Sequence, residues 1–205
     1  VCRANEHARV EQLAAYASCP VINGLTDRYH PCQALADLFT LLEVHGRLAG
    51  LKLAYVGDAN NVAHSLAVAC AHLQVRFAIA APADYQFDTA FLELLEEHHP
   101  SLDLQVTTNP LEAVRDADGV YTDVWVSMGQ EAQRQERIAV LRPYQVNGEL
   151  MAAAPSRARF MHCLPAHRGE EVTDEVIDGP QSIVVPQAAN RMHLQKGLLA
   201  WILAQ

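Results

Sequence analysis

Short apolar runs alternate along the chain with longer segments whose apolar residues recur every three or four positions. The short runs, typical of strands, cover residues 20–25, 51–56, 75–80, 104–107, 119–122 and 159–162. The helical patterns cover residues 31–44, 61–73, 88–98, 132–141 and 186–204, and Asn109-Pro110 marks a further helix start. Strands that alternate with helices favour a parallel sheet, because each crossover returns the chain to the same edge. We therefore predict an α/β fold with a doubly wound, mainly parallel sheet and helices on both faces.

Ala49-Gly50 is the predicted boundary between two parts of the chain. Residues 50–185 make a complete-looking α/β unit, whereas residues 1–49 do not make a domain by themselves. Residues 186–205 form a final helix that ends in Leu-Leu-Ala-Trp-Ile-Leu-Ala-Gln, an unusually apolar terminus. We expect this helix to pack on a domain that the chain lacks. Since Val1 is not preceded by an initiator Met, we also expect the chain to be a fragment or a processed product.

Composition narrows the classes of function. Half of the 205 residues are apolar, which allows a sizeable core, and no apolar run is long enough to cross a membrane. The net charge of -9 argues against a nucleic-acid-binding surface but leaves room for one local phosphate pocket. The five cysteines form no Cys-x-x-Cys motif, and the ten histidines form no pair with convincing metal-ligand spacing. We therefore expect a cytoplasmic protein with free thiols, no metal site, and no nucleic-acid or membrane partner.

The run Asp-Val-Trp-Val-Ser-Met-Gly, from Asp123 to Gly129, is the most specific motif. It follows a predicted strand, and ligands of an open parallel sheet bind at the carboxyl ends of the strands. There Asp123 can accept from an ammonium group, Ser127 can donate or accept, and the Met128 amide can donate to a carboxylate. The structural alternative is a plain strand end, with Asp123 capping the helix that follows and Trp125 in the core.

A second motif, His-Cys-Leu-Pro at residues 162–165, puts a thiol at the end of another predicted strand. Pro165 stops that strand, and the Ala-His-Arg-Gly-Glu-Glu that follows is typical of an exposed loop. Beside such a loop the Cys163 thiol can be partly ionised and functional, although a lone cysteine is more often a buried structural residue. A nucleophilic pair with a nearby histidine is conceivable, but no hydrolase signature accompanies it.

Two further motifs open predicted helices. In Gly57-Asp-Ala-Asn-Asn, the glycine permits a tight turn, and one asparagine can cap the helix while the other binds a carboxylate. The Gly-x-Gly-x-x-Gly fingerprint of dinucleotide-binding proteins is absent. In His30-Pro-Cys-Gln, the proline suits the first helical position. Either His30 is simply a cap, or His30 and Gln33 offer hydrogen bonds to a polar ligand at the helix terminus.

These motifs follow one another in a fixed order. They are His30-Pro-Cys-Gln, Gly57-Asp-Ala-Asn-Asn, Asp123-x-x-x-Ser-Met-Gly-Gln-Glu, His162-Cys-Leu-Pro-Ala-His-Arg-Gly-Glu-Glu and Asn190-Arg191. As an ordered set they resemble the C-terminal two-thirds of an ornithine carbamoyltransferase, over essentially the whole chain. The Ser-Met-Gly loop separates this group from aspartate, putrescine and N-acylated-ornithine carbamoyltransferases. The resemblance implies a Rossmann-like ornithine-binding domain at 50–185. It also implies that residues 1–49 are a remnant of the carbamoyl-phosphate domain plus a hinge helix.

In that family, carbamoyl phosphate and L-ornithine give L-citrulline and phosphate. The resemblance implies ornithine contacts from Asn61, Asp123, Ser127 and Met128. It implies carbamoyl-phosphate contacts from Arg3, His30, Gln33, Cys163, Leu164 and Arg191. Arg3 and His30 would polarise the carbonyl and Cys163 would lie close to the ornithine side-chain amine, so these three are the predicted catalytic residues. The resemblance implies no cofactor and a homotrimer or larger assembly for full-length members.

The family's Ser-x-Arg-Thr phosphate loop does not occur at the expected place upstream of these motifs. We therefore expect little or no transferase activity from this chain alone. Two alternatives stay open. One is a carbamoyltransferase for another amine, which would not need α-carboxylate contacts from Asn61 and Met128. The other is a non-catalytic module that binds an amino acid or a nucleotide.

Overall fold

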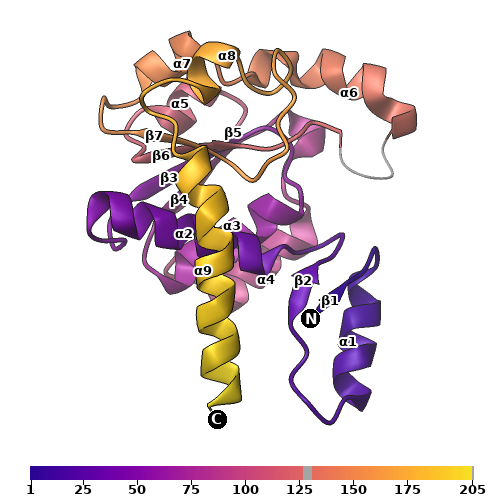
Figure 1. Cartoon of the computed structure of the whole chain (residues 1–205). Helices are drawn as coiled ribbons and strands as arrows, with labels where there is room; N and C mark the ends of the chain where they lie inside the picture. The colour runs from indigo at the N-terminus through magenta and orange to yellow at the C-terminus, as the bar shows by residue number, and fades with distance from the viewer. Residues whose placement is uncertain (127–130, 205) are drawn as a thin grey trace.

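The fold was analysed in a computed structural model, which describes residues 1–126 and 131–204. Its main sheet contains β3 (Lys52–Val56), β4 (Arg76–Ala80), β5 (Leu104–Thr107), β6 (Gly119–Thr122) and β7 (Arg159–His162). The strands are parallel and lie in the order β5-β4-β3-β6-β7 (Figure 1). The chain runs outward from β3 to β5, then returns to the other side of β3 for β6 and β7. The strand order therefore reverses between β3 and β6, which is where open parallel sheets bind ligands.

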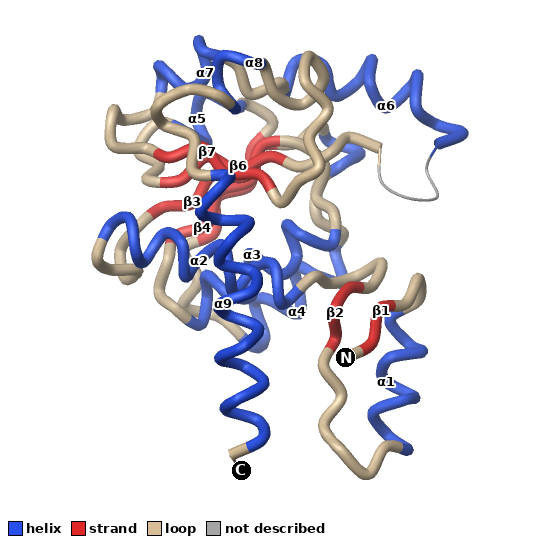
Figure 2. The backbone as a smooth tube through the Cα atoms, viewed as in Figure 1, coloured by secondary structure: helices blue, strands red, loops and turns tan. Residues whose placement is uncertain are grey.

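Helices cover both faces of this sheet (Figure 2). One face carries α2 (Pro31–His45), α3 (Asn61–His72), α4 (Thr89–His98) and α9 (Val184–Leu203). The other carries α5 (Pro110–Val114), α7 (Gly148–Ala153) and α8 (Asp174–Ile177), with α6 (Arg134–Leu141) on the same side of the sheet. The predicted doubly wound α/β fold is confirmed.

The strands read as continuous apolar runs because both of their faces are buried. In β3, Leu53 and Tyr55 join one hydrophobic cluster, whereas Ala54 and Val56 join the other. The same alternation continues through β4, β6 and β7, as expected when successive side chains point to opposite faces. Two separate cores therefore form on the two sides of one sheet.

A smaller unit forms beside the main sheet at the N-terminus. β1 (Cys2–Arg3) pairs in parallel with β2 (Asn23–Leu25), and α1 (His7–Tyr16) connects them. β2 then leads into α2, which places Arg3 near the start of that helix and at the rim of the main cavity. The small sheet thus places Arg3, a cationic residue near the N-terminus, at the edge of the main sheet.

The predicted elements agree with the structure, but several short ones were missed. The strand predicted at 20–25 begins only at Asn23, and the final helix begins at Val184 rather than 186. Pattern alone did not reveal β1, α1, α7, α8 or the three 3-10 helices, at Ala83–Tyr85, Glu131–Gln133 and Arg142–Tyr144. α1 buries only Val10, so it carries almost no apolar periodicity, and the others are too short to show a period.

The final helix packs within the chain over its first half. Gln187 and Asn190 are buried, and Asn190 Nδ2 donates to Thr40 Oγ1 at 3.0 Å on α2. Further along, Trp201 and Leu203 are 64% and 83% exposed, where the helix extends beyond the body (Figure 1). Packing of this end on another domain stays a prediction. No helix among the described residues is both long and apolar enough to cross a membrane.

Gly119, at the start of β6, offers a test of the core packing. A Cβ at this position would lie 2.8 Å from Leu53 Cδ1 and 3.4 Å from Leu41 Cδ2, both in fully packed surroundings. We expect Gly119→Ala to lower the free energy of unfolding by roughly 1–3 kcal/mol, because the core must shift to admit the methyl group.

Gly197 provides the matched control, since it lies in α9 and a Cβ there meets nothing within 4 Å. Gly197→Ala should raise the free energy of unfolding by about 0.5–1 kcal/mol, because alanine stiffens the unfolded chain and favours the helix. Urea unfolding of both variants measures the difference. Equal effects from the two substitutions would contradict the tight contact at β6.

Candidate active site

Loops at the carboxyl edge of the sheet surround one cavity of about 1100 Å³. They follow β3, β6 and β7, and the start of α2 and the first half of α9 complete the wall. The cavity brings together eight of the residues predicted for the site: Arg3, His30, Gln33, Asn61, Asp123, Cys163, Leu164 and Arg191. The other two, Ser127 and Met128, lie outside the described residues.

The Asp123 carboxylate joins the loops after β3, β6 and β7. Its Oδ1 accepts from Cys163 Sγ at 2.9 Å and from Val124 N at 2.8 Å, and its Oδ2 accepts from Asn60 Nδ2 at 2.7 Å. Trp125, two residues later, is 1% exposed, so the structural interpretation of that side chain is right. Among the described residues, the local hydrogen bond of Asp123 is to the next residue, Val124. Its remaining partners are the side chains of a cavity.

Cys163 carries a neutral thiol, which corrects the expectation of a partly ionised one. Burial raises the pKa of Cys163 well above its usual value, and the negative charge of Asp123 raises it further. A thiol that donates to a carboxylate must keep its proton. Cys163 is therefore arranged to donate a hydrogen bond rather than to attack as a thiolate.

Asn60 is a site residue that the sequence analysis did not single out. Its Oδ1 caps α3 by accepting from Val62 N and Ala63 N, while its Nδ2 holds Asp123. The neighbouring Asn61 lines the cavity and donates one N–H to Thr26 O at 2.7 Å. The sequence signal for this role was the pair of adjacent asparagines after a strand, and the first of them caps α3.

His30 lies between two cations at the other side of the cavity. It occupies the N-cap position of α2, but its side chain makes no capping bond, and its Nδ1 has no hydrogen-bond partner among the described residues. Burial lowers the pKa of His30 to about 4, helped by the positive charges of Arg191 and Arg3. Its imidazole is therefore neutral at physiological pH and carries one N–H.

Gln33 and Arg191 meet at the same wall. An Arg191 guanidinium N–H donates to Gln33 Oε1, and Gln33 Nε2 donates to Asp37 Oδ1 at 2.7 Å. These two bonds fix the direction of the Gln33 amide. With Arg3 and His30, the wall presents two cations and neutral polar groups, an arrangement that suits an anionic ligand.

The turn that carries Cys163 and Leu164 is fixed from behind by His162. Its Nδ1 accepts from Leu164 N at 2.8 Å, and its Nε2 lies 3.3 Å from Oε1 of the buried Glu171. Leu164 adopts a φ of 58°, a left-handed conformation that is uncommon outside glycine. Buried polar contacts thus hold a backbone shape that the chain would not adopt by preference.

A buried arginine ties two of the loops together. Arg137, on α6, pairs with Asp58 after β3, and its Nε donates to Trp125 O after β6 at 2.6 Å. Its guanidinium also lies 4.9 Å from the centre of the Tyr85 ring. Nothing in the sequence pattern of α6 distinguished this residue from its exposed charged neighbours.

Two groups of side chains within the described residues could bring three ligand atoms to one metal ion. Asp123, His162 and Cys163 form one group, and His167, Glu170 and Glu171 form the other, with their donor atoms within 4.8 Å of one another. In the first group, however, the thiol already donates to the carboxylate and His162 Nδ1 already accepts from Leu164 N. The internal hydrogen bonds therefore account for this arrangement without an ion.

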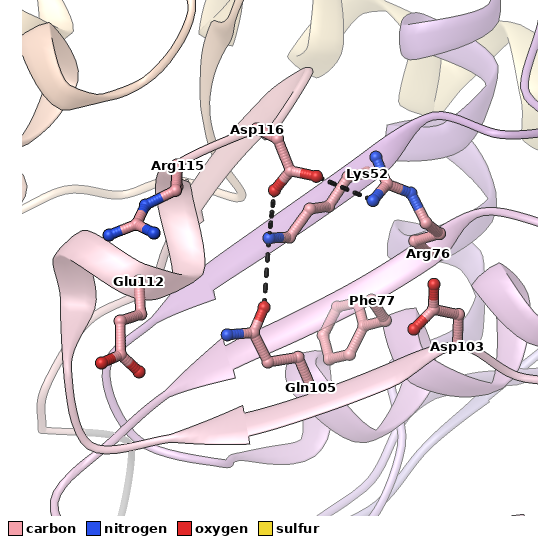
Figure 3. A pocket seen from close by; sticks show the side chains of 8 residues that line it. All are labelled: Lys52, Arg76, Phe77, Asp103, Gln105, Glu112, Arg115 and Asp116. Atoms are coloured by element: carbon pink, nitrogen blue, oxygen red, sulfur yellow. Dashed lines mark hydrogen bonds and ion pairs between the residues drawn. The ribbon is translucent and has the colours of Figure 1, made fainter.

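A second cavity, of about 550 Å³, lies at the opposite, amino edge of the sheet (Figure 3). There Lys52 Nζ donates to Gln105 Oε1 at 3.1 Å and to Asp116 at 2.5 Å, and Arg76 pairs with Asp116 as well. The two cations hold the pKa of Asp116 down at about 2. Lys52, Arg76 and Asp116 are thus paired with one another, which is typical of a structural ion-pair network.

Comparisons with known proteins agree on one family. The model for the aspartate/ornithine carbamoyltransferase Asp/Orn binding domain matches residues 49–202, and that for the carbamoyl-P binding domain matches residues 1–43. The ornithine carbamoyltransferase of Bacillus subtilis (strain 168) is 54% identical over 203 residues, which are 98% of this chain and 64% of that protein. The chain thus spans somewhat less than two thirds of this relative.

Solved structures give the same answer. Ornithine carbamoyltransferase from Pyrococcus furiosus matches with a TM-score of 0.91 and 51% identity, over 97% of this chain and 64% of that one. The enzyme of the same name from Gloeobacter violaceus matches with a TM-score of 0.88 and 46% identity, over 97% and 67%. At these identities the likeness extends beyond the fold to the sequence itself.

The lowered pKa of His30 predicts a stability that depends on pH. His30 is protonated near pH 6.5 in the unfolded chain but only near pH 4 in the fold. The unfolded chain therefore binds the extra proton between these values, and stability falls as the pH drops through this window. We expect His30→Asn to lessen this loss by up to about 3 kcal/mol.

Urea unfolding at a series of pH values measures the effect, and the slope against pH is compared rather than the stability itself. His98→Asn is the control, because His98 is exposed at the end of α4. If wild type and His30→Asn lose stability in parallel between pH 6.5 and 4, His30 is not buried as a neutral group.

Cys163 should react slowly with iodoacetamide at neutral pH, because it lacks thiolate. Cys19 is exposed and serves as the internal reference. Asp123→Asn removes the charge that helps to raise the pKa of Cys163, so alkylation should then speed up by roughly tenfold for each pKa unit removed. Peptide mass spectrometry follows the two cysteines separately. A wild-type Cys163 that reacts as fast as Cys19 would refute the neutral thiol.

Proposed function

The chain belongs to the aspartate/ornithine carbamoyltransferase family, and on this premise we propose that it serves ornithine carbamoyl transfer. The reaction passes the carbamoyl group of carbamoyl phosphate to the side-chain amine of L-ornithine and gives L-citrulline and phosphate. One observation carries the proposal: a single cavity holds a carboxylate and thiol on one wall, and two arginines and a neutral histidine on another. This division of charge suits a cationic amino acid and an anionic phosphate ester.

On the amino-acid side, Asp123 and Cys163 would receive the ornithine amine. An alkylammonium has a pKa near 10 and cannot attack, so the site must bind or generate the neutral amine. Asp123 can accept from the amine N–H groups, and the neutral Cys163 thiol helps to fix the carboxylate that does so. Asn61 would donate its second amide N–H to the α-carboxylate. Ser127 and Met128 remain proposed ornithine contacts.

On the carbamoyl side, Arg3, His30 and Arg191 would polarise the carbonyl, and Gln33 and the Leu164 carbonyl would face its amide. The amine nitrogen bonds to the carbonyl carbon, the carbon–oxygen bond to phosphate breaks, and the proton that the nitrogen loses passes to the departing phosphate. Fixed donors stabilise the oxygen that gains negative charge in between, which is typically worth a few kcal/mol each. Since the thiol is neutral, the amine itself is the nucleophile and no covalent enzyme intermediate forms.

Domain roles, assembly and location belong to the same proposal. Residues 50–185 would bind ornithine, and residues 1–49 would belong to the carbamoyl-phosphate side, in line with the two family models. We also propose a cytoplasmic location and, for the full-length enzyme, a homotrimer or larger assembly, which sedimentation equilibrium of the full-length enzyme tests directly. A monomer at micromolar concentration would refute the assembly.

Ligand-induced thermal shifts test the amino-acid site without requiring turnover. A ligand raises the melting temperature only if it binds the folded chain. We expect L-ornithine to stabilise the protein most. Norvaline should stabilise it more weakly because it lacks the side-chain amine, and putrescine least because it lacks the α-carboxylate. An equal response to putrescine would favour a carbamoyltransferase for another amine. Citrulline formation from carbamoyl phosphate and ornithine tests the reaction itself, and it is assayed with a segment that carries the family's Ser-x-Arg-Thr loop added in trans, because the chain alone is expected to have little activity.

Asp123→Asn should abolish most of the ornithine response, because the amide loses the negative charge that faces the amine. A loss of at least about tenfold in affinity is expected for a buried charge-assisted bond. Asp103→Asn is the matched control, since it removes the same charge from an exposed position at the opposite edge of the sheet. Equal responses in the two variants would count against Asp123 as the ornithine contact.

A further inference from the structure

A buried carboxyl on α2 lies behind the cavity and connects its two walls. The Asp37 side chain is fully buried. Its Oδ1 accepts hydrogen bonds of 2.7 Å from Gln33 Nε2, one turn earlier on α2, and of 2.7 Å from Gln187 Nε2, in the first turn of α9. One oxygen atom therefore holds two amides from segments about 150 residues apart in the sequence.

These bonds fix the direction in which each amide points. A primary amide has a carbonyl on one side and an NH₂ group on the other, so donation from Nε2 determines where Oε1 lies. Gln33 Oε1 accepts from Arg191 in the cavity, and Gln187 Oε1 accepts from His162 N at 3.0 Å. The His162 amide directly precedes Cys163. Asp37 therefore acts on both the cationic wall and the loop that carries the thiol.

Stability alone does not favour a carboxyl at this place. Desolvation raises the pKa of Asp37 to about 7, even though the hydrogen bonds from Gln187 and Gln33 and the nearby Tyr121 hydroxyl lower it. Its Oδ2 has no hydrogen-bond partner within the described part of the chain. Replacing a buried charge by an apolar residue is often neutral or stabilising. A perturbed carboxyl beside a cavity is typical of a functional group.

Asp37 can accept hydrogen bonds from both amides whether it is ionised or protonated. A proton on the neutral acid would sit on the unpartnered Oδ2, which leaves Oδ1 free to accept from both amides. A carboxyl further differs from an amide in that both of its ends accept, so rotation about the last side-chain bond cannot turn a donor toward Gln33 and Gln187. The shared acceptor atom, rather than the charge, is therefore the feature that matters.

We propose that Asp37 is a positioning residue, which holds Gln33 and the Cys163 loop in register through one shared acceptor. This inference rests on the proposed function and deepens it, since it assigns a role to a residue that touches no substrate. Asp37 acts through Gln33 on the carbamoyl side, and through Gln187 and the His162 amide on the thiol side.

Two substitutions separate the acceptor from the charge. Asp37→Asn keeps an Oδ1 of the same shape that can accept from both amides, but it removes the carboxylate. Asp37→Leu keeps a similar volume and removes both the acceptor and the charge. If the leucine variant does not fold, Asp37→Ala removes the same acceptor without adding bulk.

Steady-state citrulline formation, with a segment that carries the family's Ser-x-Arg-Thr loop added in trans, gives the first readout. Asp37→Leu should raise the KM for carbamoyl phosphate and lower kcat, each by roughly tenfold to a hundredfold, because small misplacements of reacting groups are costly. Asp37→Asn should stay within about threefold of wild type on both parameters, since it retains the hydrogen bonds. A fully active Asp37→Leu would overturn the proposal, and so would an Asp37→Asn variant as impaired as Asp37→Leu.

Amide hydrogen exchange at His162, followed by NMR, gives a second readout that needs no turnover. The His162 N–H is held by Gln187 in wild type and should stay protected in Asp37→Asn. In Asp37→Leu it should exchange at least about tenfold faster, because Gln187 is free to turn. Unchanged protection in a folded Asp37→Leu would overturn the proposal. If wild type makes no citrulline even with a segment that carries the family's Ser-x-Arg-Thr loop added in trans, the proposed function fails, while His162 exchange still decides the role of Asp37.

Discussion

The reversal of strand order between β3 and β6 is the constraint on which the site depends. At that point the connections leave the sheet in opposite directions, so the carboxyl ends of the two strands open a crevice that no crossover covers. The 2.7 Å bond from Asn60 to Asp123 bridges this crevice, and the cap that Asn60 provides to α3 fixes the donor. Asp123 then receives the thiol from β7. The asparagine that caps α3 thus also positions the buried Asp123 carboxylate.

A second set of polar contacts joins the chain's distant segments. Along the seam between α2 and α9, Asp37 bonds Gln187, and Thr40 and Glu43 bond Asn190. Directional bonds in a buried seam fix the rotation and the height of one helix against the other, which apolar packing alone does less strictly. Because Arg191 follows Asn190 on α9, the same seam determines how far the guanidinium reaches into the cavity.

The sequence predicted the sheet and the walls of the cavity for clear physical reasons. Strands buried on both faces produce apolar runs, and residues that follow parallel strands must meet at one edge, so Asp123 and Cys163 could be placed together from pattern alone. The ionisation of Cys163 could not, because burial and the neighbouring carboxylate are set by packing. Asn60, Asp37 and Arg137 escaped for a related reason. Their roles depend on partners far away in the sequence, at separations of 63, 150 and 79 residues.

The charged and the neutral groups of the cavity have different roles. Burial, helped by the positive charges of Arg191 and Arg3, lowers the pKa of His30 and holds it neutral. At the opposite wall, burial and the neighbouring Asp123 carboxylate raise the pKa of Cys163 and keep it protonated. Each wall of the cavity therefore has charged side chains and one neutral hydrogen-bond donor. Burial and the nearby charge keep that donor neutral. An imidazolium would compete with the arginines for an anionic group, and a thiolate would compete as a nucleophile with the amine of the proposed substrate. Holding both groups neutral leaves binding to the charges and orientation to the neutral donors, which suits a transfer between two bound substrates.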